Sequence, residues 1–335
     1  MTLHIPKAEL HLHMEGAATP DLVRMFAVRN NITLDAGLFD ANDRYVWSNF
    51  TEFLNSFDGA SRAICTRQDY ADLTYSYLTE QAKIGALYVE IFCSPSHAAE
   101  AGLSFDDHLQ GVADGIERAE KHSGIMGRII MTCVRHMGPD LAVRVAQQSV
   151  DCGHPFVVGF GMGGNESLYS QEAFYQAYKI AADGGLGCTT HAGEVEGPQS
   201  VWDAIDKLPV TRIGHGVRSI EDPKLVETLA KRGIVLEVCP GSNIALSVYP
   251  DYAAHPLRRL YDAGVRVTLG SDDPPFFHTT LAAEYQRAQD VFGFDDAQLT
   301  GITRTALEAS FVDVDTRARL LAKLDQLSGV VVHAG

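Results

Sequence analysis

Two histidines near the start of the chain have the spacing of a metal-chelating pair. His11 and His13 lie in the run ELHLHMEG, which covers residues 9–16. In a β-strand, residues two apart point to the same face, so the two imidazoles can reach one point. Zinc binds neutral imidazole nitrogen and takes about four ligands in proteins. The pair therefore indicates a metal site completed from elsewhere in the chain, although alternating histidines also occur at polar strand ends.

A second histidine motif, THAGE, covers residues 190–194. His191 ends a run of strand character and is a candidate third metal ligand. Glu194 follows three residues later, where a pocket poor in water would raise the pKa of its carboxyl and allow it to donate a proton. The alternative is a turn between a strand and a helix, with Glu194 in the first turn of the helix.

Two further motifs bring polar residues to the ends of apolar runs. His215 lies between Gly214 and Gly216, and glycines allow the backbone to pass close to a ligand. Asp272 and Asp273 are adjacent and offer one metal ligand and one acceptor for a substrate, although paired aspartates are also common in turns. Because each motif falls at the same end of a different expected strand, we predict one shared metal site.

These motifs are attached to eight short apolar runs, most of which are followed by a segment of helical character. The runs are Ala8–His13, Leu87–Cys93, Arg128–Cys133, Phe156–Phe160, Gly187–His191, Thr211–His215, Ile234–Cys239 and Arg266–Ser271. A repeated strand-then-helix order is typical of a (β/α)8 barrel or of a doubly wound open sheet. Polar residues at the carboxyl ends of several strands favour the barrel, an α/β fold of TIM type.

A helical insertion is expected after the first strand, over about residues 14–85, within one domain spanning residues 1–335. Thr19 and Pro20 have the types that begin a helix. An apolar stripe further on either packs in the core or forms a lid beside the barrel mouth. The stripe consists of Phe50, Phe53, Leu54 and Phe57.

Composition excludes several classes of partner. The 335 residues include 27 basic and 43 acidic side chains, a formal charge of −16 that repels nucleic acids and anionic membranes. Neither a membrane helix nor a signal peptide is expected, and six dispersed cysteines suit free thiols. We therefore expect a cytoplasmic protein that binds a small molecule, with no nucleic-acid or membrane partner.

Two other signatures are incomplete. Residues 159–164 match G-x-G-x-x-G, but the acid Asp183 precedes the next expected strand instead of ending it, which argues against a dinucleotide site. The sequence His13-Met14-Glu15 imitates the H-x-E of the cytidine-deaminase fold, but no P-C-x-x-C follows it.

The motifs taken in order resemble those of the adenosine deaminases of the amidohydrolase superfamily. The likeness spans nearly the whole chain and is carried by ELHLHMEG, VVGFGMGGNE, THAGE, RIGHG, EVCPGSNIALSVYP and GSDDPPFF. It implies a (β/α)8 barrel with a zinc ion whose ligands would be His11, His13, His191 and Asp272. Binuclear members of the superfamily have a lysine or glutamate at the end of the fourth strand, where this chain has residues 159–161, Gly-Phe-Gly, so we expect one metal.

The resemblance also implies catalytic roles. The zinc would lower the pKa of a water molecule to about 7. His215 matches the residue that orients this water, and Asp272 would accept its proton. Glu194 matches the donor of a proton to N1 of a 6-aminopurine, from which ammonia then leaves.

Contacts with the rest of the substrate follow from the same resemblance. Asp273 would engage N7 of the purine and Gly164 would meet N3, while Glu15 and His13 lie where the family contacts the ribose. The partner would thus be a purine nucleoside or a purine base.

The expected reaction is zinc-dependent deamination of adenosine and 2′-deoxyadenosine to inosine and 2′-deoxyinosine, in purine salvage. Gly161 and Asn165 replace two acidic residues of many relatives, which weakens the case for sugar recognition. Gly241 stands where adenine deaminases often have leucine and favours adenosine. The alternatives are deamination of adenine or of another 6-aminopurine compound such as an aminodeoxyfutalosine, and a catalytically silent purine-binding barrel.

Overall fold

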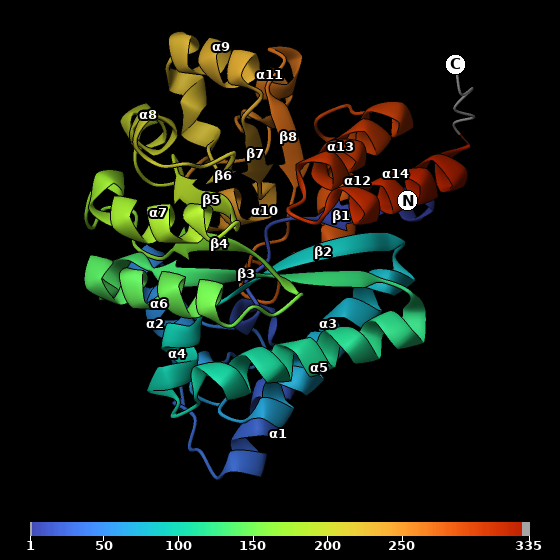
Figure 1. The fold of residues 1–335 in the computed structure, drawn as a ribbon. Helices are drawn as coiled ribbons and strands as arrows, with labels where there is room; N and C mark the ends of the chain where they lie inside the picture. The colour runs from blue at the N-terminus through green and yellow to red at the C-terminus, as the bar shows by residue number, and fades with distance from the viewer. Residues whose placement is uncertain (1, 330–335) are drawn as a thin grey trace.

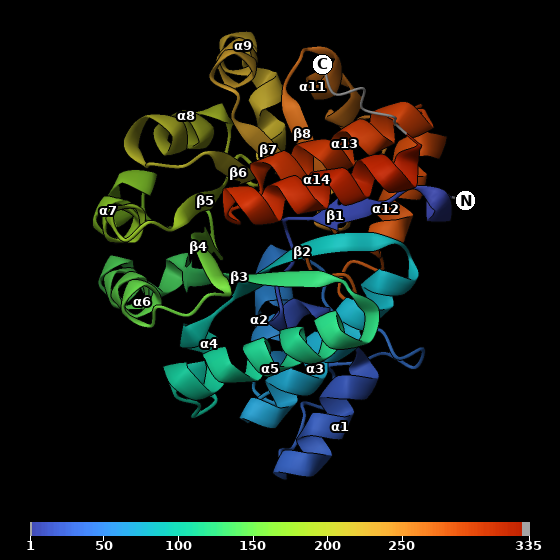
Figure 2. The same cartoon turned by 45° about the vertical axis from the view of Figure 1, so that its right-hand side comes forward.

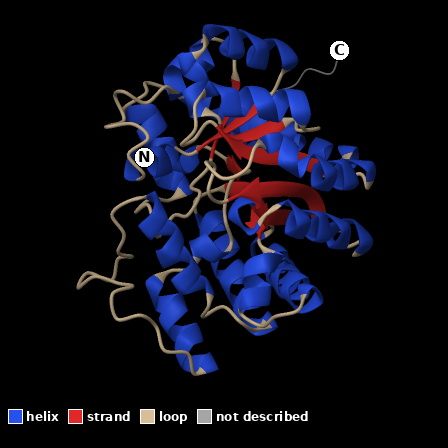
Figure 3. Cartoon of the chain, turned by 90° about the vertical axis from the view of Figure 1, so that its left-hand side faces the viewer, coloured by secondary structure: helices blue, strands red, loops and turns tan. Residues whose placement is uncertain are grey.

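The computed structural model describes residues 2–329 and contains one eight-stranded sheet in which consecutive strands pair in parallel, in the order β1 to β8. The strands are β1 (Lys7–Glu9), β2 (Ala86–Cys93), β3 (Met126–Val134), β4 (Val157–Gly163), β5 (Gly187–Ala192), β6 (Arg212–His215), β7 (Val235–Val238) and β8 (Arg266–Leu269). All eight overlap the predicted apolar runs. The strands lie at the centre and the helices outside them, which confirms the (β/α)8 barrel (Figures 1 and 3).

Helices follow or flank every strand. They are α1 (Pro20–Asn30), α2 (Phe50–Ser61), α3 (Arg67–Lys83), α4 (Pro95–Glu100), α5 (Phe105–Ser123), α6 (Pro139–Asp151), α7 (Tyr175–Asp183), α8 (Pro198–Lys207), α9 (Pro223–Arg232), α10 (Pro240–Ala245), α11 (Leu257–Asp262), α12 (Leu281–Asp290), α13 (Asp296–Ala309) and α14 (Val314–Ser328). Short 3-10 turns lie at Thr2–His4, Glu15–Ala17, Arg135–Met137, Gln171–Phe174 and Val217–Glu221. None of the helices in residues 2–329 combines the length and the apolarity needed to cross a membrane.

The barrel closes through the segments that extend β1 and β8. The amide of His13 donates to the carbonyl of Asp272 at 3.1 Å, and the amide of Asp272 donates to the carbonyl of His11 at 3.1 Å. Helix α13 packs against both β8 and β1 and covers this junction (Figure 2). Barrel closure therefore places two histidines from the beginning of the chain beside an aspartate more than 250 residues later.

Residues between β1 and β2 form the predicted helical layer, which contains α1, α2 and α3. As predicted, helix α1 begins at Pro20, and the Oγ1 of Thr19 accepts a hydrogen bond from the amide of Leu22 at 3.3 Å. In Figures 1 and 2, α1 extends away from the barrel below α3 and α5. Helix α2 lies closer to the barrel and packs against α4.

Candidate functional site

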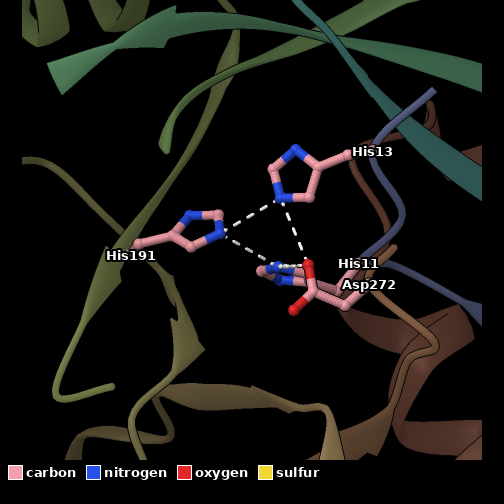
Figure 4. A group of neighbouring side chains, drawn as sticks. All are labelled: His11, His13, His191 and Asp272. Carbon is pink, nitrogen blue, oxygen red and sulfur yellow. Dashed lines mark hydrogen bonds and ion pairs between the residues drawn. The ribbon is translucent and has the colours of Figure 1, made fainter. Parts of the chain in front are cut away.

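Three imidazole nitrogens and one carboxylate oxygen converge at the carboxyl end of the barrel. The Nε2 atom of His191 lies 3.1 Å from Nε2 of His11 and 3.2 Å from Nε2 of His13. The Oδ1 atom of Asp272 lies 3.5 Å from Nε2 of His11 and 3.4 Å from Nε2 of His13. Figure 4 shows the four side chains pointing toward one another, so the structure brings together all four predicted metal ligands.

The separations within this cluster suit a bound metal ion. A tetrahedral zinc with bonds of about 2.0–2.1 Å to its ligands places neighbouring ligand atoms about 3.3 Å apart. The four separations, from 3.1 to 3.5 Å, agree with that edge length. A neutral imidazole has one acceptor nitrogen, and three such nitrogens that face one point suit a cation between them. The cluster is therefore able to bind a metal ion.

Protonation of the histidines also fits metal binding. Burial lowers the pKa of His13 to about 4 and that of His191 well below its ordinary value, so both rings are neutral at pH 7. Burial opposes the charge on His11, but hydrogen bonds to Asp272 and Glu237 raise its pKa to about 9. A cation at the cluster would displace this proton.

Groups behind the cluster fix which ring nitrogens face it. The Nδ1 of His11 lies 2.9 Å from Oε2 of Glu237, and the Nδ1 of His191 lies 2.7 Å from the carbonyl of Met162. Each Nδ1–H donates to an oxygen, which leaves Nε2 free to act as a ligand. Glu237 is fully buried and also accepts from Nε of Arg212 at 2.6 Å.

Glu194 lies in a bend between β5 and α8, not in a helix, because α8 begins only at Pro198. Its side chain lines the cavity above the cluster and is 4 % exposed. Burial, followed by the negative charges of Asp272 and Glu166, raises the pKa of the Glu194 carboxyl well above its ordinary value. This shift favours the protonated form of the carboxyl, which is the form able to donate a proton.

His215 stands beside both carboxyl groups. Its Nε2 lies 3.6 Å from Oε1 of Glu194 and 3.7 Å from Oδ2 of Asp272. The amide nitrogen of Asn243 lies 3.2 Å from Nδ1 of His215. Since an amide nitrogen only donates, Nδ1 accepts and the neutral ring carries its proton on Nε2, facing the cavity. Burial lowers the pKa of His215 to about 3, which keeps the ring neutral.

Backbone strain marks the same place. His215 has φ 59° and Asp272 has φ 64°, in the left-handed region that residues other than glycine rarely adopt. A Cβ on the neighbouring Gly214 would lie 2.8 Å from Cε1 of His11. The small residue before His215 therefore leaves room for the His11 ring.

The cavity brings the remaining predicted residues to the same place. Glu15, Gly164 and Asp273 line it together with His13. The Oδ1 of Asp273 is buried without a hydrogen-bond partner, and burial and the charge of Asp272 raise the pKa of this carboxyl. Glu15 Oε1 already accepts from the hydroxyl of Tyr70 at 3.1 Å.

One wall of the cavity is apolar and comes from α2. The predicted stripe lines it, and the ring of Phe277 packs against that of Phe53, with 4.9 Å between the centroids. Phe53 and Phe57 are buried, as the core interpretation of the stripe expects, and they also line the cavity, while a role as a lid stays a prediction. The side chains from α2 are Phe50, Phe53, Leu54 and Phe57.

Sequence reasoning missed three buried carboxyl groups that hold the site in place. Glu237 orients His11, Glu9 accepts from the backbone of Ser271 at 2.7 Å, and Glu166 accepts from the backbone beside Glu194. Glu9 and Glu237 are charged residues in strands whose residues are all buried, and a charge in such a strand is a signal that could have identified them. Glu166 lies in a loop, and no local pattern connects it with residue 194.

Comparison with known proteins gives consistent similarities over the whole chain. The family model described as "Adenosine deaminase" matches residues 6–327. Curated proteins named adenine deaminase are 51% identical in Sinorhizobium medicae and 52% identical in Agrobacterium fabrum, in each case over 97% of this chain and 99% of the relative.

Solved structures agree. An adenine deaminase from Arthrobacter aurescens superposes with a TM-score of 0.91 at 29% identity, covering 97% of this chain and 100% of that one. An amidohydrolase from Burkholderia ambifaria with bound Zn superposes with a TM-score of 0.88 at 26% identity, covering 99% of this chain and 94% of that one.

These relatives overturn the expectation of adenosine as substrate, because curated proteins about half identical to this chain are named adenine deaminase. The structure explains why Gly241 misled. This residue lies in α10, where its amide donates to Oε2 of Glu284 at 3.1 Å and a Cβ would lie 2.3 Å from Oε1. The glycine thus avoids a close contact with Glu284, which gives it a packing reason that is independent of the sugar.

The matched family, the close superpositions and the cluster able to bind a metal together indicate an enzyme of the deaminase type. The similarities extend over nearly all of this chain and of its relatives, so they apply to the barrel and its insertion alike. The chain belongs to the adenosine deaminase family of the amidohydrolase superfamily.

Proposed function

We propose that this protein is an adenine deaminase, which converts adenine and water to hypoxanthine and ammonia. The observation that carries the chemistry is a buried carboxyl with a raised pKa, that of Glu194, which lines the same cavity as a cluster able to bind a metal ion. Adenine as the substrate is supported by the 51% identical relative that is named adenine deaminase.

We propose that one Zn²⁺ binds at the cluster of His11, His13, His191 and Asp272. The donor set supports zinc, since three imidazoles and one carboxylate at tetrahedral separations suit this ion. When bound, zinc supplies Lewis-acid activation of a water molecule at neutral pH. Glu237 and the carbonyl of Met162 hold the ligand rings in the orientation that this requires.

Glu194 acts as the proton donor to the purine. Addition of water at C6 places negative charge on the ring, and a proton delivered to N1 from the carboxyl of Glu194 removes it. The C6–N6 bond then breaks. N6 takes the proton that Asp272 removed from the water and leaves as ammonia, while the oxygen stays on C6 as a carbonyl and its remaining hydrogen restores the proton of Glu194. The raised pKa of Glu194 keeps its carboxyl protonated before the reaction.

His215 and Asp272 act on the attacking water. The Nε2–H of His215 points into the cavity and orients the oxygen, and the neutral ring stabilises the negative charge that develops there. Asp272 Oδ2 lies 3.7 Å from this nitrogen, so a water between them can give its proton to the carboxylate.

Asp273 and Gly164 hold the rest of the base. The raised pKa of Asp273 gives its carboxyl a proton for N7, and its Oδ1 has no other partner. Gly164 has φ +94°, a conformation that suits glycine and exposes its backbone to N3. Glu15 and His13, which the family resemblance assigns to the ribose, line the same cavity, and the insertion over residues 14–85 supplies its apolar wall, which would pack against the base.

Product analysis tests the reaction. Purified protein whose zinc content has been measured is given adenine, and hypoxanthine and ammonia should form in equal amounts. Protein stripped of metal by a chelator should lose the activity and regain it with Zn²⁺. Zinc-loaded protein that binds adenine without releasing ammonia would contradict the proposal and support a silent purine-binding barrel.

A further inference from the structure

One buried carboxylate, that of Glu166, binds four consecutive backbone amides in the bend that carries Glu194. Its Oε1 accepts from the amide of Gly193 at 2.5 Å, and its Oε2 accepts from the amides of residues 194–196 at distances from 2.8 to 3.1 Å. The Oγ of Ser200 donates to Oε1 at 2.6 Å. Glu166 itself is 3 % exposed. Five donors thus converge on a single side chain.

Residues 193–196 have no helix or strand of their own to satisfy these amides. Gly193 has φ +69°, and on the opposite side of the bend its carbonyl accepts from the amide of Arg218 at 3.0 Å. The guanidinium of Arg218 also donates to the carbonyl of Val195. Gly193 and Glu194 are buried, and buried amide groups need an acceptor, so the path of this segment depends on the Glu166 carboxylate.

Glu166 acts at a distance from the substrate. It is not among the residues that line the cavity, whereas Glu194 is. With five donors bound, its two oxygens have little capacity left for a ligand. Glu166 therefore acts on the reaction from outside the cavity, through the segment that it binds and through its negative charge, which contributes to the raised pKa of Glu194.

We propose that Glu166 is the positioning residue for Glu194. By holding the amides of residues 193–196, it sets where the Glu194 carboxyl enters the cavity and how far it lies from the base. This inference rests on the proposed role of Glu194 as proton donor. Proton transfer needs donor and acceptor within hydrogen-bond reach, and a displacement of about 1 Å can cost about 100-fold in rate.

The variant Glu166→Gln tests this inference in the full-length, zinc-loaded protein. A side-chain amide keeps the shape but replaces one accepting oxygen with a donating NH₂ group, so part of the network is lost. We expect kcat for adenine to fall about 100-fold, with KM within about threefold of wild type and zinc content unchanged. Glu166→Asp, which keeps the charge but shortens the reach, should restore part of kcat.

The matched control is Glu196→Gln. This substitution removes the same charge from the same bend, but the side chain of Glu196 is exposed, and among the described residues it accepts a hydrogen bond from the Oγ of Ser167 alone. The kcat of Glu196→Gln should equal that of wild type. A kcat within about threefold of wild type in folded Glu166→Gln protein would overturn the inference, as would equal losses of kcat, substrate affinity and zinc.

Hydrogen exchange gives a readout that does not depend on activity. The amides of residues 193–196 should exchange slowly in wild type and in Glu196→Gln, and faster in Glu166→Gln or Glu166→Asp. If the wild-type protein does not deaminate adenine, the proposed function fails, but the exchange comparison still tests whether Glu166 holds residues 193–196 in place. Unchanged exchange in both Glu166 variants would overturn the inference, and if Glu166→Gln does not fold, Glu166→Asp alone decides it.

Discussion

Glu194 and His215 meet at the wall of the cavity, where Oε1 of the carboxyl lies 3.6 Å from Nε2 of the imidazole. Burial raises the pKa of the carboxyl well above its ordinary value and lowers that of the imidazole to about 3, so the neutral form of each group is favoured. The imidazole is uncharged at pH 7 and forms no ion pair with the carboxyl. The two groups face the cavity side by side, one suited to a ring nitrogen and the other to an oxygen.

Replacing Glu194 with glutamine should remove the proton donor and leave the fold intact. The amide is of similar size but cannot deliver a proton to N1, so kcat should fall by about 100-fold to 10,000-fold. Zinc content, measured by elemental analysis, should not change, because Glu194 is not in the ligand cluster. Turnover near the wild-type rate would show that another group supplies the proton.

The rate should fall on the alkaline side of its pH profile. Glu194 works in its protonated form, and its raised pKa keeps it protonated well above the ordinary range of a glutamate. As pH rises through that pKa the donor is lost, so kcat declines. Measurement between about pH 5 and pH 10 checks this, and the residual activity of Glu194→Gln should lack the same decline. A decline that persists in the variant would assign it to a different group.

Metal binding should depend on His11 and on the carboxylate behind it. His11→Ala should lose most of its zinc, and Glu237→Gln should bind zinc about 10-fold to 100-fold more weakly, because Nδ1 of His11 loses its charged partner. Competition with a chelator measures both affinities. Glu227→Gln, which alters an exposed carboxyl on α9, is the matched control. Full zinc occupancy in His11→Ala would exclude this residue as a ligand.

Gly241 should affect stability and not specificity. A Cβ at this position would lie 2.3 Å from Oε1 of Glu284, a buried carboxyl that also accepts from the amide of Gly241. Gly241→Ala should therefore lower the free energy of unfolding by about 1–3 kcal/mol, measured in urea. The ratio of activity on adenine to activity on adenosine should stay as in wild type. A changed ratio with unchanged stability would return Gly241 to the substrate site.

Much of the fold was predictable from the sequence because parallel strands buried on both faces leave a strong apolar signal. Each of the eight apolar runs overlaps a strand, although β1 ends at Glu9 and leaves His11 and His13 in the segment that follows it. Barrel closure through this segment brings both histidines to Asp272, which follows β8. Local spacing in the sequence indicates at which end of a strand a side chain lies. In a closed barrel, side chains at the same end of different strands lie near one another, so the motifs were enough to predict that these residues meet.

The supporting carboxylates and the substrate were not predictable in the same way. Glu166 reaches Glu194 across 28 residues, and Glu237 reaches His11 across 226, so neither contact leaves a local pattern. Gly241 resembled a specificity residue, but its environment is Glu284, a partner 43 residues away. Adenine and adenosine share the ring that reacts. The preference between them therefore depends on such distant packing and not on the motifs that perform the chemistry.

Parallel kinetics on adenine, adenosine and 2′-deoxyadenosine test the central claim most directly. Ammonia release by protein with measured zinc content gives kcat/KM for each compound under one set of conditions. The account predicts that kcat/KM for adenine exceeds that for both nucleosides by at least about 100-fold, in line with the relatives named adenine deaminase. Equal or faster turnover of adenosine would contradict it.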